Sequence, residues 1–276
     1  ALSSVNVRRV VDGEANMDRK KASQLFFAVT LIAIGVIGLT SGTFAPIWAP
    51  VPETLPAREP LAILSNLIAA GCGIALLTKR WASPGALVLL AYLIVWTLAF
   101  KAKFILFDPL EEVSYQSNGE NLVLVAAAWV LFATSAARRT FPAGEAGLRT
   151  AYLLYGLALI AFGLSHFFYL EMTAPLVPAW LPTPVFWAYL TGGIYTATGI
   201  AIAIGLYARW AAIVVAVQIA LITLLVWGPM LFSGPLSAMH WQETIVSWAL
   251  SAGAFVLATG SPPATGWLRR PSPTHR

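Results

Sequence analysis

The sequence has few charged side chains: they make up 11% of its 276 residues, whereas 58% of the residues are hydrophobic. A soluble domain carries about 25% charged residues, so this chain cannot cover a soluble surface. The composition excludes a soluble globular protein, a disordered tail and a nucleic-acid-binding domain. The single cysteine, Cys72, excludes an intramolecular disulfide framework, a C-x-x-C redox pair and a thiolate metal cage. What remains is a polytopic membrane protein.

Long apolar runs are abundant. A helix needs about 20 apolar residues to cross the hydrocarbon core of a bilayer. We therefore predict an all-α protein with eight transmembrane helices, at residues 24–42, 61–78, 85–105, 121–137, 150–170, 185–206, 210–232 and 243–260.

The lysines and arginines predict the orientation of these helices. If the N-terminus is cytoplasmic, all but three of the 17 Lys and Arg residues fall on the cytoplasmic side, the exceptions being Arg58, Lys101 and Lys103. This distribution follows the positive-inside rule. It predicts that both termini are cytoplasmic.

The two halves of the chain resemble each other. A V-P-x-x-L-P string at residues 51–56 recurs 126 residues later at 177–182, and Glu120 and Glu243 open the fourth and eighth spans. Because four spans are an even number, both units have the same orientation, as in parallel-repeat proteins. We predict two four-helix bundles at 22–140 and 141–262, with a cytoplasmic segment at 1–21 and a cytoplasmic tail at 263–276. The V-P-x-x-L-P loops either cap each bundle at the membrane interface or form the lid of an outward-facing pocket.

One string in the second half carries a family resemblance. Residues 162–167 read F-G-L-S-H-F and precede T-A-P-L-V-P-A-W-L-P at 173–182, and glycine-rich stretches lie at 35–42 and 156–163. With these features the chain resembles a tandem member of the DoxX-like family of bacterial inner-membrane proteins. The resemblance implies a multi-pass protein of the bacterial inner membrane. Some members are linked to redox chemistry, including a thiosulfate:quinone oxidoreductase subunit, and others to assembly of partner proteins.

Three functions stay open at this point. The chain is a redox-associated accessory subunit linked to a quinone or an oxidoreductase, a non-enzymatic scaffold of a larger membrane complex, or a carrier of a small hydrophobic molecule. Its partners are the lipid bilayer, other membrane proteins, and a quinone or lipid. The chain contains no P-loop, H-E-x-x-H or G-x-S-x-G motif, so neither an enzymatic activity nor a cofactor is assigned.

The candidate contact residues lie on the outer side of the second half. An ionisable group within a span is a functional-site hypothesis by default, and His166 stands where the first half has Ser41. His166 is alternatively an interfacial histidine, and Glu243 alternatively a helix-start carboxylate that complements the helix dipole. We predict ligand or partner contact, and no metal site, at His166, Glu171, Trp180, Trp187, Tyr189, His240 and Glu243. A four-residue repeat of small residues, from Gly193 to Gly205, predicts a helix-packing face.

Overall fold

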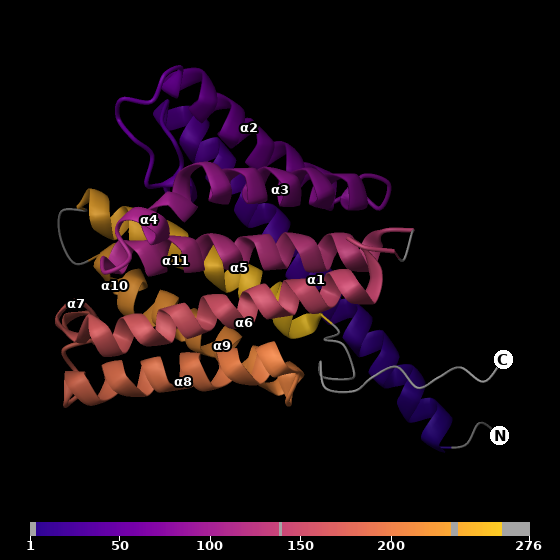
Figure 1. Cartoon of the computed structure of the whole chain (residues 1–276). Helices are drawn as coiled ribbons and strands as arrows, with labels where there is room; N and C mark the ends of the chain where they lie inside the picture. The colour runs from indigo at the N-terminus through magenta and orange to yellow at the C-terminus, as the bar shows by residue number, and fades with distance from the viewer. Residues whose placement is uncertain (1–3, 138–139, 233–236, 261–276) are drawn as a thin grey trace.

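The computed structural model describes residues 4–137, 140–232 and 237–260, and all regular structure in these ranges is helical (Figure 1). The helices of the first half are α1 (Ser4–Ser41), α2 (Arg58–Leu76), α3 (Ala82–Trp96), α4 (Ala102–Phe107) and α5 (Glu112–Ser135). Those of the second half are α6 (Gly144–Phe168), α7 (Leu170–Thr173), α8 (Pro184–Ile204), α9 (Ala208–Ile222), α10 (Gly228–Met230) and α11 (Ala238–Thr259). Each half also has one 3-10 turn, at Pro46–Trp48 and Ala174–Leu176, and one π-helical segment, at Thr97–Lys101 and Thr223–Trp227.

Six helical segments of the described chain are long and apolar enough to cross a membrane: 13–41, 58–76, 82–107, 144–168, 184–204 and 208–230. They coincide with six of the predicted spans. The other two predicted spans lie in α5 and α11, whose first turns contain several polar residues. Both helices are largely buried beyond those first turns, over residues 123–133 of α5 and most of 244–258 of α11. Helices α5 and α11 therefore lie inside the bundle, where their apolar side chains contact protein.

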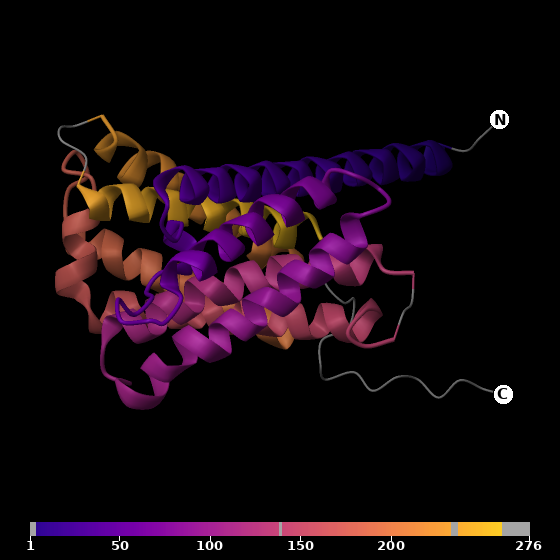
Figure 2. The same cartoon turned by 90° about the horizontal axis from the view of Figure 1, so that it is seen from above.

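The helices pack in the same order in both halves. In the first half α1 contacts α2, α2 contacts α3 and α3 contacts α5; in the second half α6 contacts α8, α8 contacts α9 and α9 contacts α11. The last helix of each half packs against the first helix of the other, α5 on α6 and α11 on α1, and α5 also contacts α11 (Figures 1 and 2). The last helix of each half therefore packs more extensively on the first helix of the other half than on the first helix of its own, although the Tyr152 hydroxyl of α6 donates a hydrogen bond of 2.7 Å to the Leu257 carbonyl oxygen of α11.

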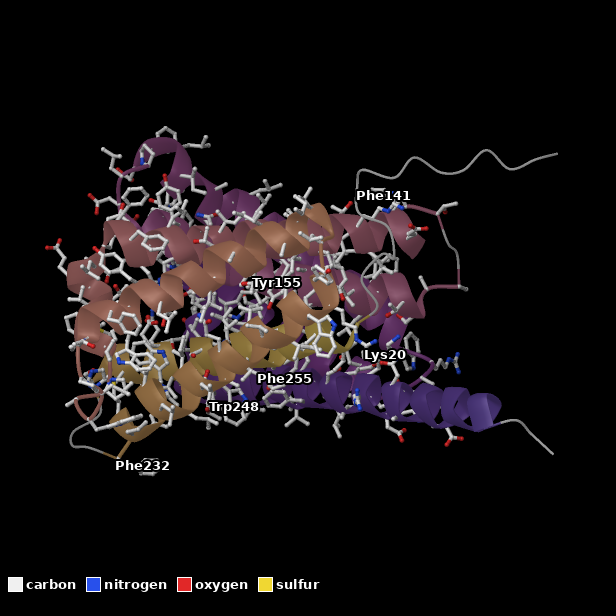
Figure 3. All side chains as sticks on the ribbon, turned by 90° about the horizontal axis from the view of Figure 1, so that it is seen from below. Lys20, Phe141, Tyr155, Phe232, Trp248 and Phe255 are labelled. Atoms are coloured by element: carbon white, nitrogen blue, oxygen red, sulfur yellow. The ribbon has the colours of Figure 1, made fainter. Side chains whose placement is uncertain are left out.

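The interface between α1 and α11 shows how this packing is made. Trp248 and Phe255 of α11 face α1 (Figure 3), where their rings lie 5.5 and 6.0 Å from the ring of Phe26. The indole Nε1 of Trp248 donates a hydrogen bond of 3.1 Å to Thr30 Oγ1. In Figures 1 and 2 the N-terminal part of α1 extends past the other helices, so the helix runs continuously through the predicted cytoplasmic segment.

The displacement of 126 residues seen in the sequence also appears in the backbone. Ala57 and Thr183, which precede α2 and α8, are both in the left-handed conformation, with φ 54°. Helices α3 and α9 begin at Ala82 and Ala208, and the two π-helical segments begin at Thr97 and Thr223. All three pairs have the same displacement, which gives a residue-by-residue correspondence between α2–α3 and α8–α9.

Glycines let α6 and α8 approach each other closely. A Cβ on Gly156 would lie 2.6 Å from the Gly199 carbonyl oxygen, and one on Gly199 would lie 2.7 Å from the Gly156 carbonyl oxygen. The predicted packing face from Gly193 to Gly205 is therefore wrong: Ala197 is exposed, and a Cβ on Gly193 would meet nothing within 4 Å among the described atoms. A spacing of four residues occurs on more than one face of α8, and the sequence did not show which face meets α6.

Candidate functional site

Two adjoining cavities lie in the second half and at its boundary with the first half. The first, of about 410 Å³, lies between α8 and α9 under the loop that follows α7. The second, of about 470 Å³, lies among α5, α6, α9 and α11. The two share His166, Thr173, Leu176, Ile222 and Trp227 in their walls.

The first cavity is a lateral apolar groove. The wall formed by α9 and the π-helical segment after it includes Val214, Val217, Leu221 and Leu225, which are 43–48% exposed. In a membrane protein such side chains on an outer face lie against lipid. The groove therefore opens towards the hydrocarbon of the bilayer.

The second cavity is more polar. Glu120 of α5 and Glu243 of α11 both line it, so each half contributes one carboxylate. Gln116 Nε2 donates a hydrogen bond of 3.1 Å to Glu120 Oε1. The Lys101 ammonium, which is only 1% exposed and donates to the Ala49 carbonyl oxygen at 2.6 Å, interacts electrostatically with Glu120. This cavity has carboxylates in its walls, and the residues that line the lateral groove include none.

His166 stands where the two cavities meet. It lies near the end of α6, its Nδ1 is 2.8 Å from the Phe162 carbonyl oxygen, and its ring is 5.7 Å from that of Tyr195. A carbonyl oxygen only accepts hydrogen bonds, so Nδ1 carries the proton and Nε2 is an acceptor in the neutral ring. A Cβ on Gly192 would lie 2.7 Å from His166 Cβ and 3.0 Å from the Gly163 carbonyl oxygen, and glycine at this position therefore lets α6 approach α8 closely at His166.

Gln218 supplies a second acceptor in the lateral groove. Its Nε2 donates a hydrogen bond of 3.2 Å to the Thr191 carbonyl oxygen of α8. Its Oε1 is buried and has no hydrogen-bond partner among the described protein atoms. A buried acceptor without a partner is costly, and the same Gln218 amide also forms a hydrogen bond with the Tyr195 side chain.

In the first half a tryptophan fills the corresponding space. Trp48 is 0% exposed and its Nε1 donates a hydrogen bond of 3.2 Å to Asn66 Oδ1. Its ring lies 5.5 Å from that of Tyr92 and 5.2 Å from that of Trp96. The first half is thus packed with aromatic rings at the place where the second half is hollow.

The structure separates the predicted contact residues into two groups. His166, Trp187 and Glu243 line the cavities. The other four predicted residues do not: Glu171 and Trp180 are exposed, Tyr189 stacks on Phe167, and His240 lies in the first turn of α11.

Among the lining residues that sequence reasoning did not place at the site, those that bear most on its chemistry are Gln116, Glu120, Leu176 and Gln218. The match of Glu120 with Glu243 was a usable signal, since it pairs two carboxylates. In the described ranges, no three His, Cys, Asp or Glu side chains come together as a metal site.

Residues 148–228 match the family model described as DoxX, so the resemblance to the DoxX-like family is confirmed over that segment. The match includes α8, α9 and most of α6, the helices that carry His166 and the lateral groove. Comparisons with curated proteins and with solved structures gave no match. Together with the apolar helices, the match identifies a multi-pass membrane protein with a DoxX-like segment.

Proposed function

We propose that this protein binds a membrane-dissolved amphipathic molecule in its second half and serves as an accessory subunit for a redox partner in the bacterial inner membrane. One observation carries the proposal: an apolar groove that opens sideways and a cavity with two carboxylates meet at His166. Ligand sites are typically cavities of about 300–1,000 Å³ with apolar walls and a few polar groups, and both cavities fit that description.

The two cavities suit the two parts of such a molecule. The hydrocarbon part would lie in the groove between α8 and α9, and the head would lie beside His166. Because Val214, Val217 and Leu221 form an outer wall of the groove, a ligand could enter from the bilayer without passing through water. This route favours a lipid-soluble molecule over a polar metabolite.

The redox association comes from the DoxX-like resemblance, and it makes an isoprenoid quinone the first ligand to test. The site would lie on the outer side in the predicted topology of eight spans with both termini cytoplasmic. The absence of charged residues from the walls of the groove itself agrees with a long apolar chain. A phospholipid tail has the same property, so the experiment must separate the two.

The test uses purified protein in nanodiscs. Organic extraction followed by mass spectrometry identifies lipophilic molecules that copurify, and calorimetry measures binding of a quinone with one isoprene unit. We expect saturable binding of this quinone in its reduced form, whose O–H can donate to His166 Nε2, and His166→Ala should weaken that binding about tenfold, the effect of losing one hydrogen bond of about 1.4 kcal/mol.

His240→Ala is the matched control, because His240 lines neither cavity, and it should bind like the unmodified protein. Copurification of phospholipid alone, with no saturable quinone binding, would redirect the proposal to a lipid. No copurifying molecule and no binding of quinone or phospholipid would refute it.

A further inference from the structure

We infer that the head of the ligand is a planar aromatic ring carrying an O–H or N–H donor, bound in the second half where the first half holds the indole of Trp48. The inference rests on the proposed function and specifies its ligand. It starts from the difference between two halves that otherwise share one packing order.

The displacement of 126 residues shows which residues surround the two spaces. Tyr92 and Trp96, which pack on the Trp48 ring, correspond to Gln218 and Ile222. Both counterparts line the cavities of the second half. The walls that hold an indole in the first half therefore enclose an open volume in the second.

The 3-10 turns explain why one space is filled and the other is open. Each turn follows the first helix of its half and ends at Trp48 or at Leu176, which are 128 residues apart, so these two residues are matched by their place at the end of the turn and not by the displacement of 126 residues. Trp48 is 0% exposed within the first half, whereas Leu176 lines both cavities of the second. In the first half the Trp48 indole thus fills the space. In the second half the smaller Leu176 side chain leaves the equivalent space open to the ring of a ligand.

The hydrogen-bonding groups indicate what the ring must carry. In the first half the acceptor is Asn66 Oδ1, which receives the indole N–H. Its counterpart on α8 is Gly192, and the His166 side chain occupies the space beside that glycine. His166 Nε2 and Gln218 Oε1 are both acceptors, so the ligand that complements them is a donor.

Three probes of similar size test separately whether the ligand needs a planar ring and whether it needs a hydrogen-bond donor. 1-Naphthol has a planar ring and a donor, 1-methoxynaphthalene keeps the ring and lacks the donor, and trans-decahydro-1-naphthol keeps the donor and lacks the planar ring. Calorimetry on the full chain in nanodiscs, corrected with empty nanodiscs, measures their binding. We expect 1-naphthol to bind about tenfold more tightly than either analogue, since each lacks one of the two interactions.

Two substitutions locate the binding. Leu176→Trp should place an indole in the cavity and abolish 1-naphthol binding, whereas Leu206→Trp, on the exposed surface after α8, should leave binding unchanged. Gln218→Leu removes one acceptor and should weaken 1-naphthol binding several-fold while leaving 1-methoxynaphthalene unaffected. This second variant tests the inference even if Leu176→Trp fails to fold.

The outcomes distinguish the inference from the proposed function. Equal binding of the three probes, sensitive to His166→Ala, would refute the aromatic donor and leave an amphipathic ligand standing. Naphthol binding that survives both Leu176→Trp and Gln218→Leu would place the ring elsewhere and overturn the inference. Absence of binding by every probe, in a protein that copurifies with no lipophilic molecule, would refute both.

Discussion

Replacing Trp48 with alanine tests whether the first half depends on its internal ring. The indole is fully buried between Tyr92 and Trp96, and truncating a buried tryptophan costs about 3–5 kcal/mol of stability. The loss is mainly one of packing, because the backbone N–H of Ala45 still donates to Asn66 Oδ1 at 3.3 Å. For a chain of this size each kcal/mol shifts Tm by about 2–4 °C, so we expect a decrease of roughly 6–20 °C.

The assay is thermal unfolding of the detergent-solubilised protein, followed by the loss of the monodisperse peak in size-exclusion chromatography. Trp81→Ala is the matched control, since Trp81 is 55% exposed and surface substitutions usually change stability by about 0.5 kcal/mol or less. Indole should raise the Tm of Trp48→Ala more than that of the unmodified protein, because the variant gains a second vacant ring site and a ligand that binds only the folded state stabilises it. A Trp48→Ala protein that unfolds at the same temperature as Trp81→Ala would refute the reasoning.

Three further predictions follow from the packing and the topology. Gly156→Val should lower the Tm by several degrees, because its side chain meets the Gly199 carbonyl oxygen, whereas Gly193→Val should not; equal thermal shifts would contradict the α6–α8 contact. In a Cys72→Ala background, a cysteine at the exposed Leu110 should react with a membrane-impermeant maleimide from outside the cell, and one at the exposed Thr140 should react only after permeabilisation; the reverse labelling would overturn the topology. Each half expressed alone should aggregate, whereas co-expressed halves should copurify, because α5 packs on α6 and α11 on α1; a monodisperse single half would show that it closes by itself.

Most of the helix positions could be predicted from the sequence because apolar run length determines which segments can span a bilayer. The displacement of 126 residues could be predicted as well, since the V-P-x-x-L-P strings have the same displacement as the starts of α3 and α9. The packing of α5 on α6 and of α11 on α1 could not be predicted from the sequence, because it is visible only in the burial and the contacts of these helices. Run length shows where a helix lies and gives no information on its neighbours.

The candidate site could be predicted only in outline. An ionisable residue near a span end pointed to His166, and the repeat comparison with Ser41 strengthened that choice. Trp180 and Tyr189 were predicted together with His166 and do not line the two cavities, since an interfacial ring and a cavity ring look alike in sequence. Gln218 and Leu176 could not be recognised, because their role depends on the space left where the first half has Trp48.

The central claim is that the second half is hollow and binds a lipid-soluble ring, while the first half is filled by its own. Photolabelling with a diazirine-bearing naphthol in nanodiscs, followed by peptide mass spectrometry, shows directly which half of the protein binds the ring. The account predicts saturable adducts at cavity-lining residues between His166 and Trp227, competed by 1-naphthol and lost in Leu176→Trp. Saturable adducts that instead concentrate between Ser41 and Lys101, around Trp48, would contradict it.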